Sequence, residues 1–196
     1  MAEVRKDNPN LKDKEIFDMA NQYATAMAVL HEKGIVHCDQ KPENTYIKIE
    51  KNEDGSNRYH VKVGDFGYAV MKGEDIAGGT PGFLAPELAL KAEIGETIPA
   101  EPSSDVWQMG CVFAEMLGKG DWINYCADLS ENKMWSDSDP KFLQGKMEKY
   151  FHEFYDSGHP DYIIAKCLNI DPKERSSAEE VAKMWDNLAK YGDAEG

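Results

Sequence analysis

The sequence predicts a mainly α-helical domain with one small β-hairpin. Apolar residues recur at helical spacing through most of the chain, and only two short runs alternate as strands do. The 196 residues are 41% hydrophobic and 30% charged, which is typical of one globular domain with a buried core. We expect a polar segment at 1–12, the domain at 13–191 and a short tail at 192–196.

The charge balance excludes some classes of partner. Acidic side chains number 36 against 22 basic ones, so the net charge is -14. A field of this sign repels phosphate backbones, and we therefore expect no nucleic-acid partner. No run reaches the roughly 18–20 apolar residues of a membrane span, so no membrane association is expected. The four cysteines form no C-x-x-C pair, and the N-terminus has no apolar signal sequence, which together predict a soluble cytoplasmic protein.

The first third of the chain predicts one helix and then the hairpin. Apolar side chains recur at helical spacing at Ile16, Ala20, Tyr23, Met27 and Leu30. Gly34 is suited to the left-handed conformation that ends a helix. Residues 45–50 and 59–63 alternate as strands do, and the turn-forming residues between them predict a hairpin with an enlarged loop.

The remaining two thirds predict mostly helices joined by loops. Residues 68–103 are rich in glycine and proline, so we expect loop with one helix around 87–92. Residues 104–117 are apolar almost all round, which predicts a buried helix. We expect an irregular acidic segment at 118–139. The apolar spacing then predicts three more helices, at 141–155, 161–168 and 178–191.

Two polar motifs flank the predicted hairpin. The run HCDQKPEN places the carboxylate of Asp39, the amine of Lys41 and the amide of Asn44 on one short loop. The run GDFG places Asp65 where the second strand ends. Closure of the hairpin would bring the oxygens of Asn44 and Asp65 close together. Two oxygen ligands completed by substrate phosphates are a common way to bind Mg²⁺, so these two residues are candidate metal ligands.

Five segments in this order resemble the C-terminal lobe of a eukaryotic-type protein kinase. They are HCDQKPEN at 37–44, GDFG at 64–67, GTPGFLAPE at 79–87, SDVWQMGC at 104–111 and DPKER at 171–175. The resemblance implies a protein-kinase-like fold over 13–191. It also implies phosphoryl transfer from ATP to a hydroxyl of a protein substrate, with Mg²⁺ as the metal.

The resemblance implies a role for each candidate site residue. Asp39 and Lys41 would be catalytic, with Asp39 orienting the substrate hydroxyl and Lys41 facing the transferred phosphate. Lys41, Asn44 and Asp65 would bind the cofactor, and Asn44 and Asp65 would be the metal ligands. Lys41 together with Thr80 resembles the serine/threonine class of kinase.

Other positions resemble structural residues of the family. Glu87 and Arg175 resemble a buried ion pair that braces the loop against the helices. Asp105 is expected to bind the backbone of the catalytic loop. His37 is expected to pack in the core, and His31 is expected to be a surface or packing residue.

Two residues of the catalytic loop depart from the family pattern. Cys38 stands where the family usually has an arginine that receives an activation-loop phosphate. The only hydroxyls between Phe66 and Glu87 belong to Tyr68 and Thr80, so activation by loop phosphorylation is not expected. A glutamine follows Asp39 where the family usually has leucine.

The chain also lacks features that a complete kinase needs. The 36 residues before His37 contain no G-x-G-x-x-G loop and no strand lysine, so we expect half of the adenine pocket to be missing from this chain. An N-lobe or a regulatory protein is therefore an expected partner, as is a protein substrate, for which the acidic charge favours basic sequences. The alternative is a non-catalytic, pseudokinase-like scaffold. The four candidate site residues favour the enzyme, and the missing N-lobe favours the scaffold.

Overall fold

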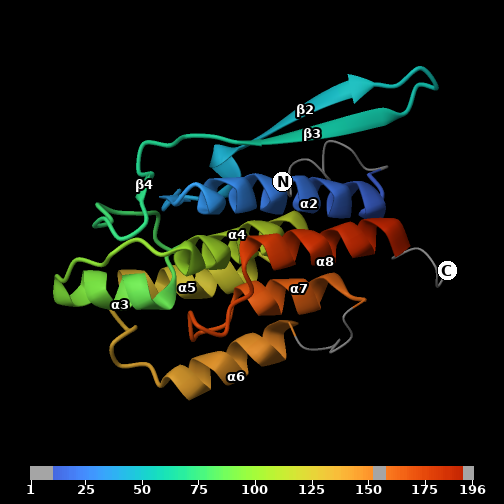
Figure 1. Cartoon of the computed structure of the whole chain (residues 1–196). Coiled ribbons are helices and arrows are strands. Elements are labelled where there is room, and N and C mark those ends of the chain that lie inside the picture. The colour runs from blue at the N-terminus through green and yellow to red at the C-terminus, as the bar shows by residue number, and fades with distance from the viewer. Residues whose placement is uncertain (1–10, 152–157, 192–196) are drawn as a thin grey trace.

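The computed structural model describes residues 11–151 and 158–191 (Figure 1). The polar segment predicted at 1–12 lies mostly outside these ranges, and the tail at 192–196 lies entirely outside them. The helices are α2 (Asp13–Glu32), α3 (Pro86–Ile94), α4 (Pro102–Met116), α5 (Asp121–Glu131), α6 (Pro140–Phe151), α7 (Pro160–Cys167) and α8 (Ala178–Tyr191). The strands are β1 (Ile35–Val36), β2 (Thr45–Lys51), β3 (Asn57–Val63) and β4 (Val70–Met71).

Helix α4 forms the centre of the core, as its apolar sequence predicts. Trp107 and Phe113 on this helix are fully buried, and the helix contacts α2, α5 and α7. Helices α2 and α8 lie side by side (Figure 1). Trp185 of α8 packs edge-on against Phe113, with ring centroids 5.2 Å apart, and lies 5.7 Å from Phe17 of α2. Aromatic side chains therefore join the three helices, which contributes both apolar burial and directional ring contacts.

The prediction of an irregular segment at 118–139 is wrong for residues 121–131, which form α5. Four side chains on one face of α5 are buried in the core, and the acidic side chains point outward. The buried side chains are Trp122, Ile123, Cys126 and Leu129. Their spacing is helical, but the acidic and polar composition of the whole 118–139 segment obscured the pattern. Packing of this apolar face against the core stabilises a helix that composition did not predict.

The hairpin is confirmed, but its loop is shorter than predicted. Strands β2 and β3 pair in antiparallel register from Thr45 opposite Val63 to Lys51 opposite Asn57. Only residues 52–56 remain as the loop. The pairing extends beyond the alternating apolar run because backbone hydrogen bonds continue through polar residues whose side chains face solvent.

A second strand pair was not predicted. Ile35 of β1 lies opposite Met71 of β4, and Val36 lies opposite Val70. Each strand has only two residues, which is too short for a detectable alternating pattern. Gly34, at φ 72°, ends α2 in the left-handed conformation as predicted and directs the chain into β1. This pairing places β4, which follows the 64–67 segment, beside β1, which leads into the 37–44 loop.

The remaining predicted helices are present. The helix expected around 87–92 is α3, and those expected at 161–168 and 178–191 are α7 and α8. The helix expected at 141–155 is α6, which ends at Phe151, and the rest of that prediction lies outside the described residues. Across 11–151 and 158–191, none of the helices has the length and hydropathy of a membrane span.

Candidate active site

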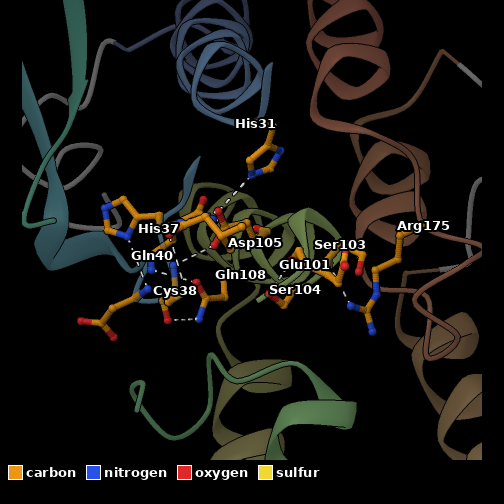
Figure 2. A network of polar contacts seen from close by, with 12 residues as sticks. His31, His37, Cys38, Gln40, Glu101, Ser103, Ser104, Asp105, Gln108 and Arg175 are labelled. Carbon is orange, nitrogen blue, oxygen red and sulfur yellow. Dashed lines mark hydrogen bonds and ion pairs between the residues drawn. The ribbon is translucent and has the colours of Figure 1, made fainter. Parts of the chain in front are cut away.

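Asp105 in the first turn of α4 binds the backbone of the 37–44 loop (Figure 2). Its Oδ2 accepts a hydrogen bond from the backbone N of His37 at 2.7 Å, and its Oδ1 accepts one from the backbone N of Cys38 at 2.9 Å. Cys38 has a φ of 67°, a left-handed conformation that is uncommon for a residue other than glycine. The buried carboxylate thus stabilises a sharp turn directly before Asp39, as expected for Asp105.

Gln108 binds the same loop from the next turn of α4. Its Oε1 accepts a hydrogen bond from the backbone N of Gln40 at 3.0 Å, and its Nε2 donates to the carbonyl of Cys38 at 2.9 Å. The Nε2 of Gln40 donates in turn to the carbonyl of Asp105 at 2.9 Å. All of these groups are buried. Sequence reasoning missed Gln108, although its position three residues after Asp105 places the two on one helix face.

His31 at the end of α2 also belongs to this network. Its Nε2 lies 2.9 Å from Oδ2 of Asp105, and its side chain is only 10% exposed. His31 is therefore a packing residue, one of the two expected possibilities, and its contact with Asp105 is what the sequence did not indicate. Local spacing carries no signal for this contact because the two residues are 74 positions apart.

Asp39, Lys41 and Thr80 form a closed triangle of polar contacts. The Thr80 hydroxyl donates to Oδ1 of Asp39 at 2.7 Å, and the Lys41 Nζ lies 3.0 Å from its Oδ2. The Lys41 Nζ also donates to Oγ1 of Thr80 at 2.9 Å. Burial alone raises the pKa of Asp39, but the hydrogen bonds from Thr80 and Lys41 and the charge of Lys41 outweigh it, so the pKa lies below its ordinary value. Asp39 is therefore ionised at neutral pH.

Asn44 ends the short 3₁₀ helix η1 (Pro42–Asn44) beside Asp39. Its Nδ2 donates to the carbonyl of Asp39 at 2.7 Å, and this orientation leaves the amide oxygen available as a ligand. Its own carbonyl accepts a hydrogen bond from the backbone N of Gly64 at 2.9 Å. Because Asp65 follows Gly64 directly, the structure brings the backbones of the two candidate metal ligands together, as hairpin closure predicts.

Asp65 is exposed and has a φ of 59°. Its Oδ1 accepts one long hydrogen bond, from the backbone N of Gly67 at 3.4 Å. Carboxylate and amide oxygens are hard ligands that suit Mg²⁺, so the donor set of Asn44 and Asp65 fits this ion. Within the described residues there is no cluster of three or more His, Cys, Asp or Glu that could bind a metal. Substrate phosphates and water would therefore have to supply the other ligands.

His37 packs in the core as expected. It is fully buried, and its Nε2 lies 3.0 Å from the carbonyl of Gly64. Its ring lies against Phe66, with centroids 5.0 Å apart. The same side chain therefore contacts both polar motifs, which connects the 37–44 loop to the 64–67 segment.

Cys38 is fully buried beside Val36 and Ala100. Burial raises the pKa of its thiol to about 12, and the charges of Asp105 and Asp39 contribute in the same direction. The thiol is therefore protonated at neutral pH. The position that the family usually gives to a phosphate-binding arginine is therefore occupied here by a buried, uncharged side chain.

Glu87 and Arg175 form the expected ion pair, between α3 and the loop before α8. The Arg175 Nη1 and Nη2 donate to the two carboxylate oxygens of Glu87, each at 2.7 Å. Arg175 also donates to the carbonyl of Ser103 at 2.9 Å (Figure 2). It donates as well to the carbonyl of Asn169 at 2.8 Å. The guanidinium lies over Trp107, 5.2 Å from the ring centroid. These contacts join the end of the 79–87 segment to the helical core.

Comparison with known sequences decides the family. The chain matches the protein kinase domain over residues 1–185. It belongs to the protein kinase family. Protein kinases in general use ATP and Mg²⁺, and they act on protein substrates. The structure is compatible with a kinase-like fold, in which helices surround α4 and a small antiparallel hairpin flanks the site.

Several curated kinases are similar to the chain. It is 26% identical to the interferon-induced, double-stranded RNA-activated protein kinase of Rattus norvegicus, over 95% of the chain and 33% of that protein. It is 33% identical to mitogen-activated protein kinase kinase kinase 17 of Arabidopsis thaliana, over 90% of the chain and 43% of that protein. It is 28% identical to the liver/testis phosphorylase b kinase gamma catalytic chain of Mus musculus, over 87% of the chain and 39% of that protein. The chain thus spans about a third to two fifths of the length of these relatives.

Proposed function

We propose that the chain is the C-terminal catalytic lobe of a serine/threonine protein kinase. It would transfer the terminal phosphoryl group of ATP to a Ser or Thr hydroxyl of a protein. The observation that carries this proposal is the triangle of Asp39, Lys41 and Thr80, in which an alcohol already donates to an ionised carboxylate at 2.7 Å. A substrate hydroxyl requires the same kind of acceptor.

The chemistry asked of these residues is positioning and charge neutralisation. Asp39 would accept a hydrogen bond from the substrate hydroxyl and orient its oxygen toward the phosphorus. The Lys41 ammonium, 3.0 Å from Asp39, would neutralise charge on the transferred phosphoryl group. Asn44 and Asp65 would bind Mg²⁺, which supplies Lewis-acid neutralisation of the ATP phosphates when bound. Because α4 holds the loop before substrate binds, little reorganisation is needed.

ATP binding would need groups that these residues do not supply. The family's glycine-rich loop and strand lysine are not found in the 196 residues. We propose that a separate N-lobe or a regulatory protein covers the phosphates. The second candidate function is a non-catalytic scaffold, which the lack of these two features in the 196 residues favours.

Phosphoryl transfer distinguishes the two functions. The protein, with and without an N-lobe fragment of the kinase family, is incubated with labelled ATP, Mg²⁺ and a generic basic protein, and labelled phosphoserine and phosphothreonine are measured. We expect Asp65→Ala to reduce transfer at least about 100-fold through loss of a metal ligand. Asp137→Ala, at an exposed carboxylate outside the site, is the matched control. Equal activity in Asp65→Ala and the control would refute the enzyme, and absence of both ATP binding and transfer would favour the scaffold.

A further inference from the structure

An apolar groove of about 700 Å³ opens between α3, α6 and the loop that joins α7 to α8. Helices α3 and α6 lie on the side of the molecule away from the hairpin (Figure 1). Leu90 of α3, Trp135, Leu143 of α6 and Ile170 line the groove. Leu90 is 38% exposed, so part of this apolar side chain is accessible to a ligand. A volume of this size accommodates one or two large apolar side chains of a ligand.

The groove has firmly placed walls. Glu93 of α3 accepts hydrogen bonds from the backbone N of Trp135 at 2.9 Å and of Ser136 at 3.1 Å. The indole Nε1 of Trp135 donates to Ser130 at 2.9 Å. On the opposite wall, Gln144 of α6 accepts from the backbone N of Ile170 at 2.9 Å. These contacts hold the aromatic wall against α3 and hold α6 against the α7–α8 loop, so the groove exists without a ligand.

The charges around the groove are predominantly acidic. Glu87, Glu148 and Asp171 line it, against the single cation Lys141. Glu87 is paired with Arg175, but Glu148 and Asp171 accept hydrogen bonds only from neutral donors in the described residues. A carboxylate can accept several hydrogen bonds, so both retain capacity for a cation. Together with the net charge of -14, this complements a ligand that is apolar and basic.

The groove is connected to the candidate active site by a short segment. Thr80, which contacts Asp39, is six residues before Pro86, which lines the groove. Six residues span at most about 20 Å when fully extended. A polypeptide anchored in the groove therefore reaches Asp39 with a linker of roughly six to ten residues.

We propose that this groove docks a basic segment of the protein substrate, at a distance from the phosphorylated hydroxyl. One or two large apolar side chains enter beside Leu90 and Trp135, and a flanking Lys or Arg pairs with Glu148 and Asp171. The groove binds this segment independently of phosphoryl transfer. The assignment of the segment to a substrate rests on the proposed kinase function.

Peptide binding tests the surface without ATP. The probe is a fluorescein-labelled synthetic peptide of about twelve residues with two leucines and four lysines, and its anisotropy is measured during titration with the protein. We expect saturable binding that weakens at least about tenfold when the leucines become serine or the lysines become glutamate. Binding should also weaken with added salt. Absence of saturable binding, or equal binding of the leucine-free peptide, would overturn the proposal.

Two variants assign the binding to the groove. Leu90→Asp and Glu148→Lys should each weaken probe binding at least about tenfold. Val29→Asp and Glu53→Lys are the matched controls, because both side chains are exposed on other elements and lie outside the groove. They should change affinity by less than about twofold. Circular dichroism of each variant verifies folding, and unchanged binding by a folded Leu90→Asp variant would overturn the groove as the site.

A tethered substrate tests the source of the segment. In the full-length protein, KM is measured for a phosphoacceptor peptide alone and for the same peptide joined to the probe sequence by an eight-residue linker. We expect the tethered form to have a KM at least about tenfold lower, and the ratio to fall to about one in Leu90→Asp. A ratio of one in the unaltered protein would overturn the assignment to a substrate. If no phosphoryl transfer occurs at all, the kinase function fails, and the binding experiment still decides the groove.

Discussion

The 37–44 loop and the 64–67 segment supply the two halves of the proposed site, and they differ in burial and in hydrogen bonding to the rest of the protein. In the loop, Asp39 is 3% exposed and Asn44 is 4% exposed, and both are hydrogen-bonded to neighbours from other elements. In the segment, Asp65 is exposed with one long bond to its own turn, and Phe66 is 48% exposed.

The difference shows which part of the site the helical core prepares in advance. Helix α4 binds the loop backbone through Asp105 and Gln108, so the position of Asp39 does not depend on a ligand. Asp65 depends on the turn around it and on whatever binds its carboxylate. Groups with few buried contacts open at low free energy. We therefore expect the Asp65 carboxylate to take up a fixed orientation only when ATP, Mg²⁺ and a covering partner are present.

The largest expected effect comes from removing the side chain that supports the 37–44 loop. Asp105→Ala should destabilise the fold by about 4 kcal/mol, because it leaves the buried N–H groups of His37 and Cys38 without an acceptor. Urea unfolding measures this loss. Asp65→Asn should leave the urea midpoint unchanged, since the side chain is exposed and asparagine tolerates the left-handed φ of 59°. Equal losses in the two variants would contradict the comparison.

The next effect tests whether the helical core also supports the end of the 79–87 segment. Arg175→Met should cost about 3 kcal/mol, because it leaves Glu87 unpaired and the carbonyls of Ser103 and Asn169 without their donor. Lys183→Met, in an exposed ion pair, is the control and should leave the midpoint unchanged. A midpoint for Arg175→Met within error of the control would show that the ion pair does not brace this segment.

A smaller effect of opposite sign is expected at Gln40. Its Oε1 is buried and has no hydrogen-bond partner among the described residues. Gln40→Leu removes this unsatisfied oxygen and should stabilise the fold by about 1 kcal/mol, despite losing the bond from Nε2 to Asp105. Gln108→Leu is the contrast, because it leaves the backbone of Gln40 and Cys38 unpaired and should destabilise. A loss of stability in Gln40→Leu would show that its amide is part of the loop's support.

The smallest effect concerns pH. Thr80→Val removes a hydrogen bond that lowers the pKa of Asp39, so this pKa should rise, and stability at neutral pH should fall by about 1 kcal/mol. Because the folded-state pKa lies below the unfolded value, Asp39 stabilises the fold above its unfolded pKa and loses this effect as pH falls through the folded pKa. The two proteins should therefore converge in stability in acid. Unfolding across pH measures this, with exposed Thr97→Val as the control, and a constant difference would contradict it.

Most helices were predictable because their apolar spacing is local and regular. The buried α4 was clear from its sequence, and Gly34 marked the end of α2. Helix α5 was missed because it is short and lies within an acidic, polar segment, and only the packing of its buried side chains against the core shows which face they share. The length of the hairpin was missed for a related reason, since backbone pairing extends through polar residues.

The identities of Asp39, Lys41, Asn44 and Asp65 could be read from two short motifs, because their order along the chain is itself the signal. Their support could be read only in part, because the resemblance implied the roles of Asp105 and of the Glu87–Arg175 pair but not those of His31 and Gln108. His31 and Gln108 bind partners 68 to 74 positions away, and no local pattern encodes such contacts.

The sequence by itself determined the family resemblance, the order of the polar motifs and most of the helices, because these depend on neighbouring residues. Only the tertiary structure decided that α4 fixes one half of the site and leaves the other exposed. It also decided that α3 and α6 border a groove lined by apolar side chains and by more acidic than basic ones. Both features arise from packing between segments far apart in the chain, where burial sets which polar groups must find partners.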